Sequence, residues 1–213
     1  LAANPDFGSP VGTIMFWIKS AGTVPPGSSG AMLFDRRIEP VAGFSSCGDV
    51  IVQSDDGSIT VQPQYYGANV LSAPLSGGSV SDNKWHQIAY VYDQATTGSI
   101  TLYVDGAPVG SGTYKTDYAW AWPATQQIEL GQSHDAFWEF FDGQMDDVRF
   151  YNRVLTDTEV ALVYSSDALV DPAALKLRFN FDSAPGGMGV SWSPSVAVPE
   201  TAGTVTGPYV DQT

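Results

Sequence analysis

The sequence predicts an all-β fold, a sandwich of two antiparallel sheets with one short helix. Apolar and polar residues alternate with a period of two along many short stretches, which is typical of strands buried on one face. The 22 glycines and 14 prolines are numerous enough to supply turns between such strands. With 213 residues and a hydrophobic content of 43%, the chain can bury the core of one large domain.

The first 66 residues predict four strands. Residues 13–20 (TIMFWIKS) carry the β-branched and aromatic side chains that strands favour, and residues 31–37 (AMLFDRR) follow a loop rich in Pro, Gly and Ser. Residues 49–53 (DVIVQ) and 58–66 (SITVQPQYY) flank the tetrapeptide 54–57 (SDDG). Because Asp-Gly supplies the positive φ of a tight turn, these two strands are predicted to form a hairpin.

Residues 86–164 predict five further strands and the helix. The alternating segments are residues 86–93, 99–104, 107–112, 126–132 and 144–151. Thr156 and Glu159 then match the capping-box pattern S/T-x-x-E ahead of an apolar stretch. This pattern predicts a short helix over about residues 157–164.

The domain organisation follows from the C-terminal third. Residues 175–182 (LKLRFNFD) predict a late strand that either closes the sandwich or opens a next repeat. Residues 183–213 are dominated by Gly, Pro, Ser and Thr, and we expect little regular structure there. We therefore predict a single domain over residues 1–182, followed by a C-terminal segment, within a longer chain.

Four segments resemble a known family of domains. They are residues 16–20 (FWIKS), 84–93 (KWHQIAYVYD), 100–110 (ITLYVDGAPVG) and 141–164 (FDGQMDDVRFYNRVLTDTEVALVY). Together they resemble the laminin-G-like, concanavalin-A-like lectin/glucanase jelly-roll domains of bacterial secreted proteins, over roughly residues 10–165. The resemblance implies a jelly-roll sandwich in a secreted or cell-surface protein, covalently linked to neighbouring domains. Such domains bind glycans, bind proteins or space other domains, so the fold does not give the function.

The charge of the chain excludes some partners. There are 23 acidic and nine basic residues, which gives a formal net charge of −14. A surface this acidic repels phosphate backbones, so we expect neither nucleic acid nor anionic membranes as partners. No apolar stretch is long enough to predict insertion into a membrane. Cys47 is the single cysteine, which excludes an internal disulfide and a cysteine-based metal site.

A carbohydrate site is predicted from aromatic residues that lie outside the strands. If the chain is extended there, Trp120 and Trp122 share one face about 6.6 Å apart, near the spacing of neighbouring sugar rings. Trp138 and His134 lie on a separate loop that could meet them at the rim of the sandwich. Sugar rings stack on indole, while their hydroxyls need polar partners. We expect the polar partners to be His134, Asp135, Asp117 and Arg36, and we expect Tyr118 to supply a further ring. We therefore expect a polysaccharide or oligosaccharide to bind here without being cleaved.

Two alternatives stay open. In the first, the chain is an adhesin or spacer domain for protein interaction and its aromatic rings are buried. In the second, less favoured, it is a glycoside hydrolase, which requires two carboxylates about 5–10 Å apart in one cleft. Glu139 and Asp142 are three residues apart and would lie on opposite faces of a strand, and the neighbours Asp146 and Asp147 fail for the same reason. We therefore expect no enzymatic activity.

Calcium is implied by the resemblance. Related domains hold a structural Ca²⁺ with an aspartate of the DDVR segment, backbone carbonyls and an acid near the N-terminus. In this sequence these acids are Asp146 or Asp147 and Asp6. In the alternative reading, the aspartates accept hydrogen bonds or pair with Arg149 or Arg153.

Overall fold

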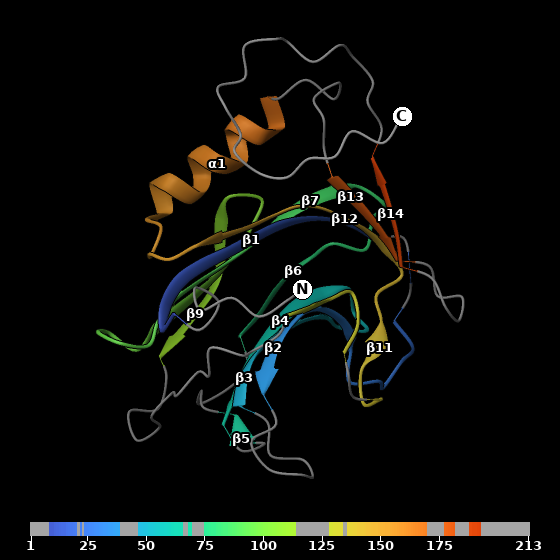
Figure 1. The fold of residues 1–213 in the computed structure, drawn as a ribbon, viewed down its shortest axis with the longest axis horizontal. Coiled ribbons are helices and arrows are strands. Elements are labelled where there is room, and N and C mark those ends of the chain that lie inside the picture. The colour runs from blue at the N-terminus through green and yellow to red at the C-terminus, as the bar shows by residue number, and fades with distance from the viewer. Residues whose placement is uncertain are drawn as a thin grey trace, which may run out of the picture.

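Two facing β-sheets and one helix make up the fold (Figure 1). In this computed structural model the described residues are 9–20, 22, 24–38, 47–65, 68–69, 75–113, 128–133, 136–169, 177–181 and 188–192. Within them each sheet has seven strands, which confirms the predicted β-sandwich.

The first sheet contains most of the strands that the sequence predicted. Its neighbours are antiparallel, and its order is β14 (Met188–Trp192), β13 (Leu177–Phe181), β12 (Gly143–Tyr151), β1 (Val11–Ser20), β7 (Trp85–Asp93), β8 (Ser99–Val104) and β9 (Ala107–Thr113). The late strand β13 pairs with β12, so it extends this sheet. The strand β14 lies in the segment 183–213, where the sequence predicted little regular structure.

The second sheet is built around the predicted hairpin of β3 and β4. Its order is β10 (Glu129–Leu130), β2 (Ala31–Ile38), β3 (Cys47–Gln53), β4 (Ser58–Tyr65) and β5 (Ala68–Asn69), with β11 (Glu139–Phe140) beside β2 and β6 (Leu75–Ser79) beside β4. The pairing of β11 with β2 is parallel, unlike the other pairs of this sheet. The short strands β5, β6 and β11 were not predicted, because a two-residue or Gly-rich strand carries no alternation to detect.

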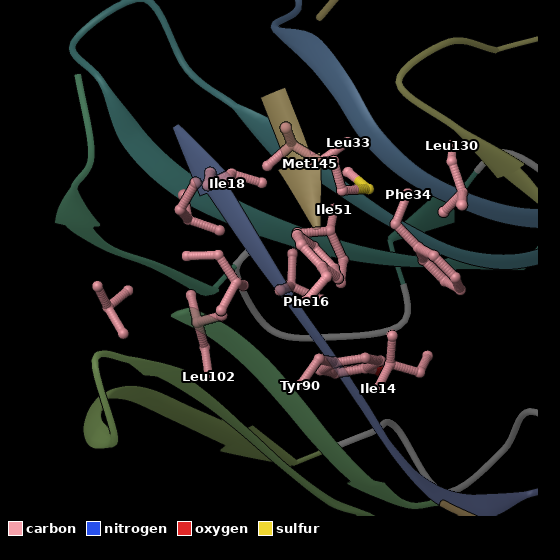
Figure 2. Packing of buried hydrophobic residues seen from close by; sticks show 14 of the residues in the cluster. Ile14, Phe16, Ile18, Leu33, Phe34, Ile51, Tyr90, Leu102, Leu130 and Met145 are labelled. Carbon is pink, nitrogen blue, oxygen red and sulfur yellow. The ribbon is translucent and has the colours of Figure 1, made fainter. Parts of the chain in front are cut away.

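The main core lies between the two sheets (Figure 2). Strand β1 shows how alternation builds it, because Ile14, Phe16 and Ile18 all point inward and are at most 1% exposed. Met15, on the other face of the same strand, packs in a second apolar cluster with Leu155 and others. Both faces of the first sheet are therefore covered, the inner one by the second sheet and the outer one by the helix (Figure 1).

The helix α1 (Asp157–Leu169) begins at the predicted capping box. The amide of Glu159 donates to Thr156 Oγ1 at 3.3 Å, and the amide of Thr156 donates to Glu159 Oε2 at 2.9 Å. The helix continues five residues beyond the predicted end at 164. The hydroxyls of Ser165 and Ser166 donate to backbone carbonyls three residues earlier, so these serines are accommodated inside the last turns.

Candidate functional site

A cleft of about 280 Å³ opens where the end of β1, the start of β2, the end of β3 and the segment around β11 meet. Its lining residues are Ser20, Gly22, Val24, Pro25, Ala31, Gln53, Glu139, Phe140 and Asp142. The volume is close to the lower limit of small-molecule sites, about 300 Å³. The cleft therefore suits a small ligand or a short length of a longer one.

Two buried aromatic side chains fix the wall of the cleft that contains β11. Trp138 is 7% exposed and Phe141 is 1% exposed, whereas Glu139 and Phe140 between them face solvent. Backbone hydrogen bonds hold the same segment, since the Glu139 amide donates to Gly30 at 3.0 Å and the Phe141 amide donates to Gly131 at 2.9 Å. The exposed pair is thus presented from a segment that is fixed at both ends.

Gly22 allows the opposite wall to approach Asp142 closely. A Cβ at position 22 would lie 2.9 Å from the Asp142 carbonyl oxygen and 3.0 Å from its Cβ, which is closer than real Cβ atoms tolerate. A side chain at position 22 would therefore force the two segments apart. The cleft depends on this glycine for its shape.

The lining combines an apolar ring with polar groups. Phe140 is 62% exposed, Glu139 and Asp142 are exposed as well, and all three residues line the cleft. Deeper in the cleft, Gln53 is 1% exposed and its Nε2 donates to Ser81 Oγ at 2.5 Å. Ser20 is also 1% exposed, and its Oγ has no hydrogen-bond partner within the described part of the chain. A ring face with acceptors and a hydroxyl around it can bind a ligand that has both C–H faces and polar substituents.

Comparison with known proteins identifies the family. The family model described as the concanavalin A-like lectin/glucanases superfamily (Laminin_G_3) matches residues 2–161. The chain belongs to this superfamily. The comparison with curated protein sequences finds no relative.

Solved structures share the fold of this concanavalin A-like domain at low sequence identity. Domain 4 of AbnA, a GH43 extracellular arabinanase from Geobacillus stearothermophilus solved with arabinotriose, matches at 18% identity and a TM-score of 0.51, over 77% of this chain and 68% of that one. The binding domain of botulinum neurotoxin serotype D matches at 16% identity and a TM-score of 0.55, over 78% of this chain and 39% of that one. A Trypanosoma rangeli sialidase solved with 2,3-difluorosialic acid matches at 16% identity and a TM-score of 0.56, over 78% of this chain and 24% of that one. The concanavalin A-like domain therefore spans much less than the whole of the last two proteins.

The structure corrects the prediction for Trp138 in the concanavalin A-like domain. Its ring was expected to stack on a sugar at the surface, but it packs against Met32, Val50 and Val52 on the second sheet. Phe137 contacts the ring edge-on, with centroids 5.0 Å apart and planes at 89°. A ring that is 7% exposed cannot offer a face to a sugar, so the stacking role at this position was wrong. The exposed rings are its neighbours Phe137 (66%) and Phe140 (62%).

The prediction of a surface position for Arg36 was also wrong. It was expected to contact a ligand from the surface, but it lies between the two sheets and is 1% exposed. Its Nη2 donates to the Asp49 carboxylate and its Nη1 donates to Tyr92 Oη at 2.6 Å, with the guanidinium 4.4 Å from the Tyr92 ring centroid. Burial acts to lower the pKa of Arg36, but Tyr92, Asp49 and Tyr90 outweigh it and raise the pKa, so the side chain stays charged. The group stabilises the core and cannot reach a glycan.

Seven further predicted site residues lie outside the described residues. They are Asp6, Asp117, Tyr118, Trp120, Trp122, His134 and Asp135. The predictions at these positions stand as made.

Of the three acids in the calcium prediction, the structure describes Asp146 and Asp147. Asp147 has a positive φ of 51° and its carboxylate accepts hydrogen bonds from Arg149, one of them at 2.9 Å, which is the pairing that the alternative reading expected. This pairing occupies the oxygens that an ion would need. Asp146 is 4% exposed, so it offers one buried carboxylate. No group of three or more His, Cys, Asp or Glu gathers as if around a metal within the described ranges, so an ion at Asp146 would need backbone, water or Asp6 oxygens as well.

Glu139 and Asp142 were expected on opposite faces of one strand, but no strand contains both residues. β11 ends at Phe140, and neither Phe141 nor Asp142 belongs to a strand. Both acids line the same cleft. Alternation of side chains applies only within a strand, so spacing along the sequence did not decide their faces.

His86 has a structural place in the concanavalin A-like domain. Its Nδ1 lies 2.7 Å from Asp105 Oδ2 and its Nε2 lies 2.9 Å from Asp82 Oδ1. The ring thus ties the start of β7 to the turn between β8 and β9.

Among the described residues no helix has the length and apolar character that crossing a membrane requires.

Proposed function

We propose that this concanavalin A-like domain is a non-catalytic carbohydrate-binding module of a larger secreted or cell-surface protein. The observation that supports this best is the cleft that the exposed residue Phe140 lines together with the exposed acids Glu139 and Asp142. The ring offers a flat apolar surface to the C–H face of a sugar. The carboxylates accept hydrogen bonds from the hydroxyls of the same sugar.

The buried part of the cleft adds fixed polar groups. Gln53 is held by its bond to Ser81, and the Ser20 hydroxyl lies beneath the opening. Binding sites gain specificity from a few well-placed polar groups in a largely apolar lining. Solved structures with this fold include one with arabinotriose and one with a sialic acid derivative, which supports a sugar as ligand without identifying it.

A glycan array followed by titration calorimetry tests the proposal. The decisive variant is Phe140→Ala, which we expect to weaken binding of the best array ligand roughly three- to tenfold, by loss of one stacking contact. Phe137→Ala is the matched control, because Phe137 is equally exposed but does not line the cleft. Absence of binding to every plant, algal and host glycan on the array would overturn the proposal.

A glycoside hydrolase is the second candidate, because Glu139 and Asp142 share the cleft. Hydrolysis of a glycosidic bond uses two carboxylates, one of them protonated at the working pH by a raised pKa. Both side chains are exposed to solvent. Release of reducing ends from a bound polysaccharide, lost in both Glu139→Gln and Asp142→Asn, would establish this activity in place of simple binding.

A further inference from the structure

We infer that the cleft selects glycans by charge, and that its preferred ligand is a sugar with a free ammonium group, such as a hexosamine unit without an N-acetyl group. This inference rests on the proposed function and specifies the ligand class of the same cleft. Three features carry it: the two carboxylates, the exposed ring and the buried serine hydroxyl.

The charged residues that line the cleft have one sign. Glu139 and Asp142 are exposed on its wall, and no Lys or Arg is among its described lining residues. Four of the described cations form ion pairs elsewhere, namely Arg36–Asp49, Lys84–Asp82, Arg149–Asp147 and Arg153–Glu159. With 23 acidic and nine basic residues in the chain, the wider field has the same sign. An anionic sugar such as a uronic acid is repelled at this cleft and a cationic sugar is attracted.

The ring adds a second preference for a cation. Phe140 follows Glu139 directly and is two residues from Asp142, it is 62% exposed, and it lines the same cleft. An ammonium group is attracted to the electron-rich face of an aromatic ring as well as to carboxylates. A neutral hydroxyl in the same place gains only hydrogen bonds. The combination of ring and acids therefore favours an amine over a hydroxyl on an otherwise identical sugar.

Ser20 supplies an observation that does not depend on the acids. Ser20 is 1% exposed and lines the cleft. Its Oγ has no hydrogen-bond partner among the described residues. Buried hydroxyls without a partner are uncommon and indicate a missing partner at that position. Since the hydroxyl oxygen can accept as well as donate, it can accept a hydrogen bond from an ammonium or a hydroxyl that enters the cleft.

The experiment compares four oligosaccharides of equal length with the whole chain. They are a glucosamine oligomer, its fully N-acetylated form, a neutral glucose oligomer and a galacturonic acid oligomer. At low salt and a pH near 6, where the amine is charged, we expect the glucosamine oligomer to bind about tenfold or more tightly than either neutral one, and the galacturonate to bind weakest. Raising the salt concentration should reduce the preference, because both carboxylates are exposed to screening.

Two variants assign the preference to the cleft. Glu139→Gln combined with Asp142→Asn should reduce the preference for glucosamine to less than about threefold, while the melting temperature stays unchanged because both side chains are exposed. Asp93→Asn is the matched control and should retain the preference. Asp93 on β7 pairs with Val11 at one end of β1, and the cleft residue Ser20 lies at the other end of β1. At about 3.3 Å per residue, Val11 and Ser20 are roughly 30 Å apart.

The possible results separate the two proposals. Equal binding of the glucosamine and N-acetylated forms would overturn the charge selection and leave the carbohydrate-binding function standing. Tighter binding of the galacturonate would overturn it as well. A preference for glucosamine that survives the double variant would place the selection outside this cleft and overturn the inference. If none of these oligomers and no glycan on the array binds, the proposed function fails too.

Discussion

The guanidinium of Arg36 on β2 donates to the carboxylate of Asp49 on β3 inside the sandwich, and the two side chains are 1% and 0% exposed. Tyr90 Oη donates to the other Asp49 oxygen at 3.0 Å, and Tyr92 Oη accepts from Arg36 at 2.6 Å. These tyrosines belong to β7, so the ion pair joins the two sheets across the core.

Removal of one partner of this buried pair should destabilise the domain strongly. In Asp49→Ala the Arg36 charge stays buried without its carboxylate, and we expect a loss of about 3–5 kcal/mol in the free energy of unfolding. Denaturant titration followed by tryptophan fluorescence measures it. Lys84→Ala, which breaks the exposed pair with Asp82, is the comparison and should cost much less. Similar losses in the two variants would contradict the structural role assigned to Arg36.

Substitutions at Trp138 and Phe140 should differ in their effect on stability, because the first ring is buried and the second is exposed. Trp138→Ala removes a large buried ring from contact with Met32, Val50 and Val52, and we expect a loss of about 3–5 kcal/mol in the free energy of unfolding. Phe140→Ala should change that free energy by less than about 0.5 kcal/mol, because the ring is 62% exposed. Thermal unfolding of both variants checks this, and a destabilised Phe140→Ala would show that its ring is not free to meet a ligand.

His86 should make the stability depend on pH near neutrality. Partial burial acts to lower the pKa of His86, but the hydrogen bonds to Asp82 and Asp105 outweigh it and raise the pKa above its usual 6.5. A group whose pKa is higher in the folded than in the unfolded state stabilises the fold, and this contribution is complete at pH values below the unfolded pKa. For His86 the contribution is therefore complete below about pH 6.5 and is lost as the pH rises through the folded pKa.

The comparison of wild type with His86→Gln isolates this effect. Glutamine keeps hydrogen-bonding capacity but takes up no proton. The difference in melting temperature between the two proteins should be largest at about pH 5–6 and should shrink as the pH rises toward about 9. A difference that stays constant over this range would show that His86 does not change its charge there.

Calcium, which the family resemblance implies, should act through Asp146. An ion that binds only the folded state raises the melting temperature by mass action, so melting in calcium should exceed melting in chelator. Asp146→Asn should abolish this rise, whereas Asp147→Asn should keep it because Arg149 already holds that carboxylate. Equal melting of the wild type in calcium and in chelator would count against a bound ion.

The sequence by itself determined the features that depend on neighbours along the chain. Alternation predicted strands such as β1 and β8, Asp-Gly predicted the turn between β3 and β4, and the capping box of Thr156 and Glu159 predicted where α1 begins. Each is a local property, because strand faces, tight turns and helix starts are fixed by residues within a few positions.

The tertiary structure decided the features that depend on residues far apart in the chain. Trp138 is buried because β2 and β3 offer it an apolar surface, and Arg36 is tolerated inside because Asp49 and Tyr92 meet it there. Glu139 and Asp142 share a cleft because β11 stops after two residues beside Ala31. Residue type alone favoured a tryptophan as the binding ring and an arginine as a surface contact. Burial is set by the partners that folding brings together, and alternation along one segment does not contain that information.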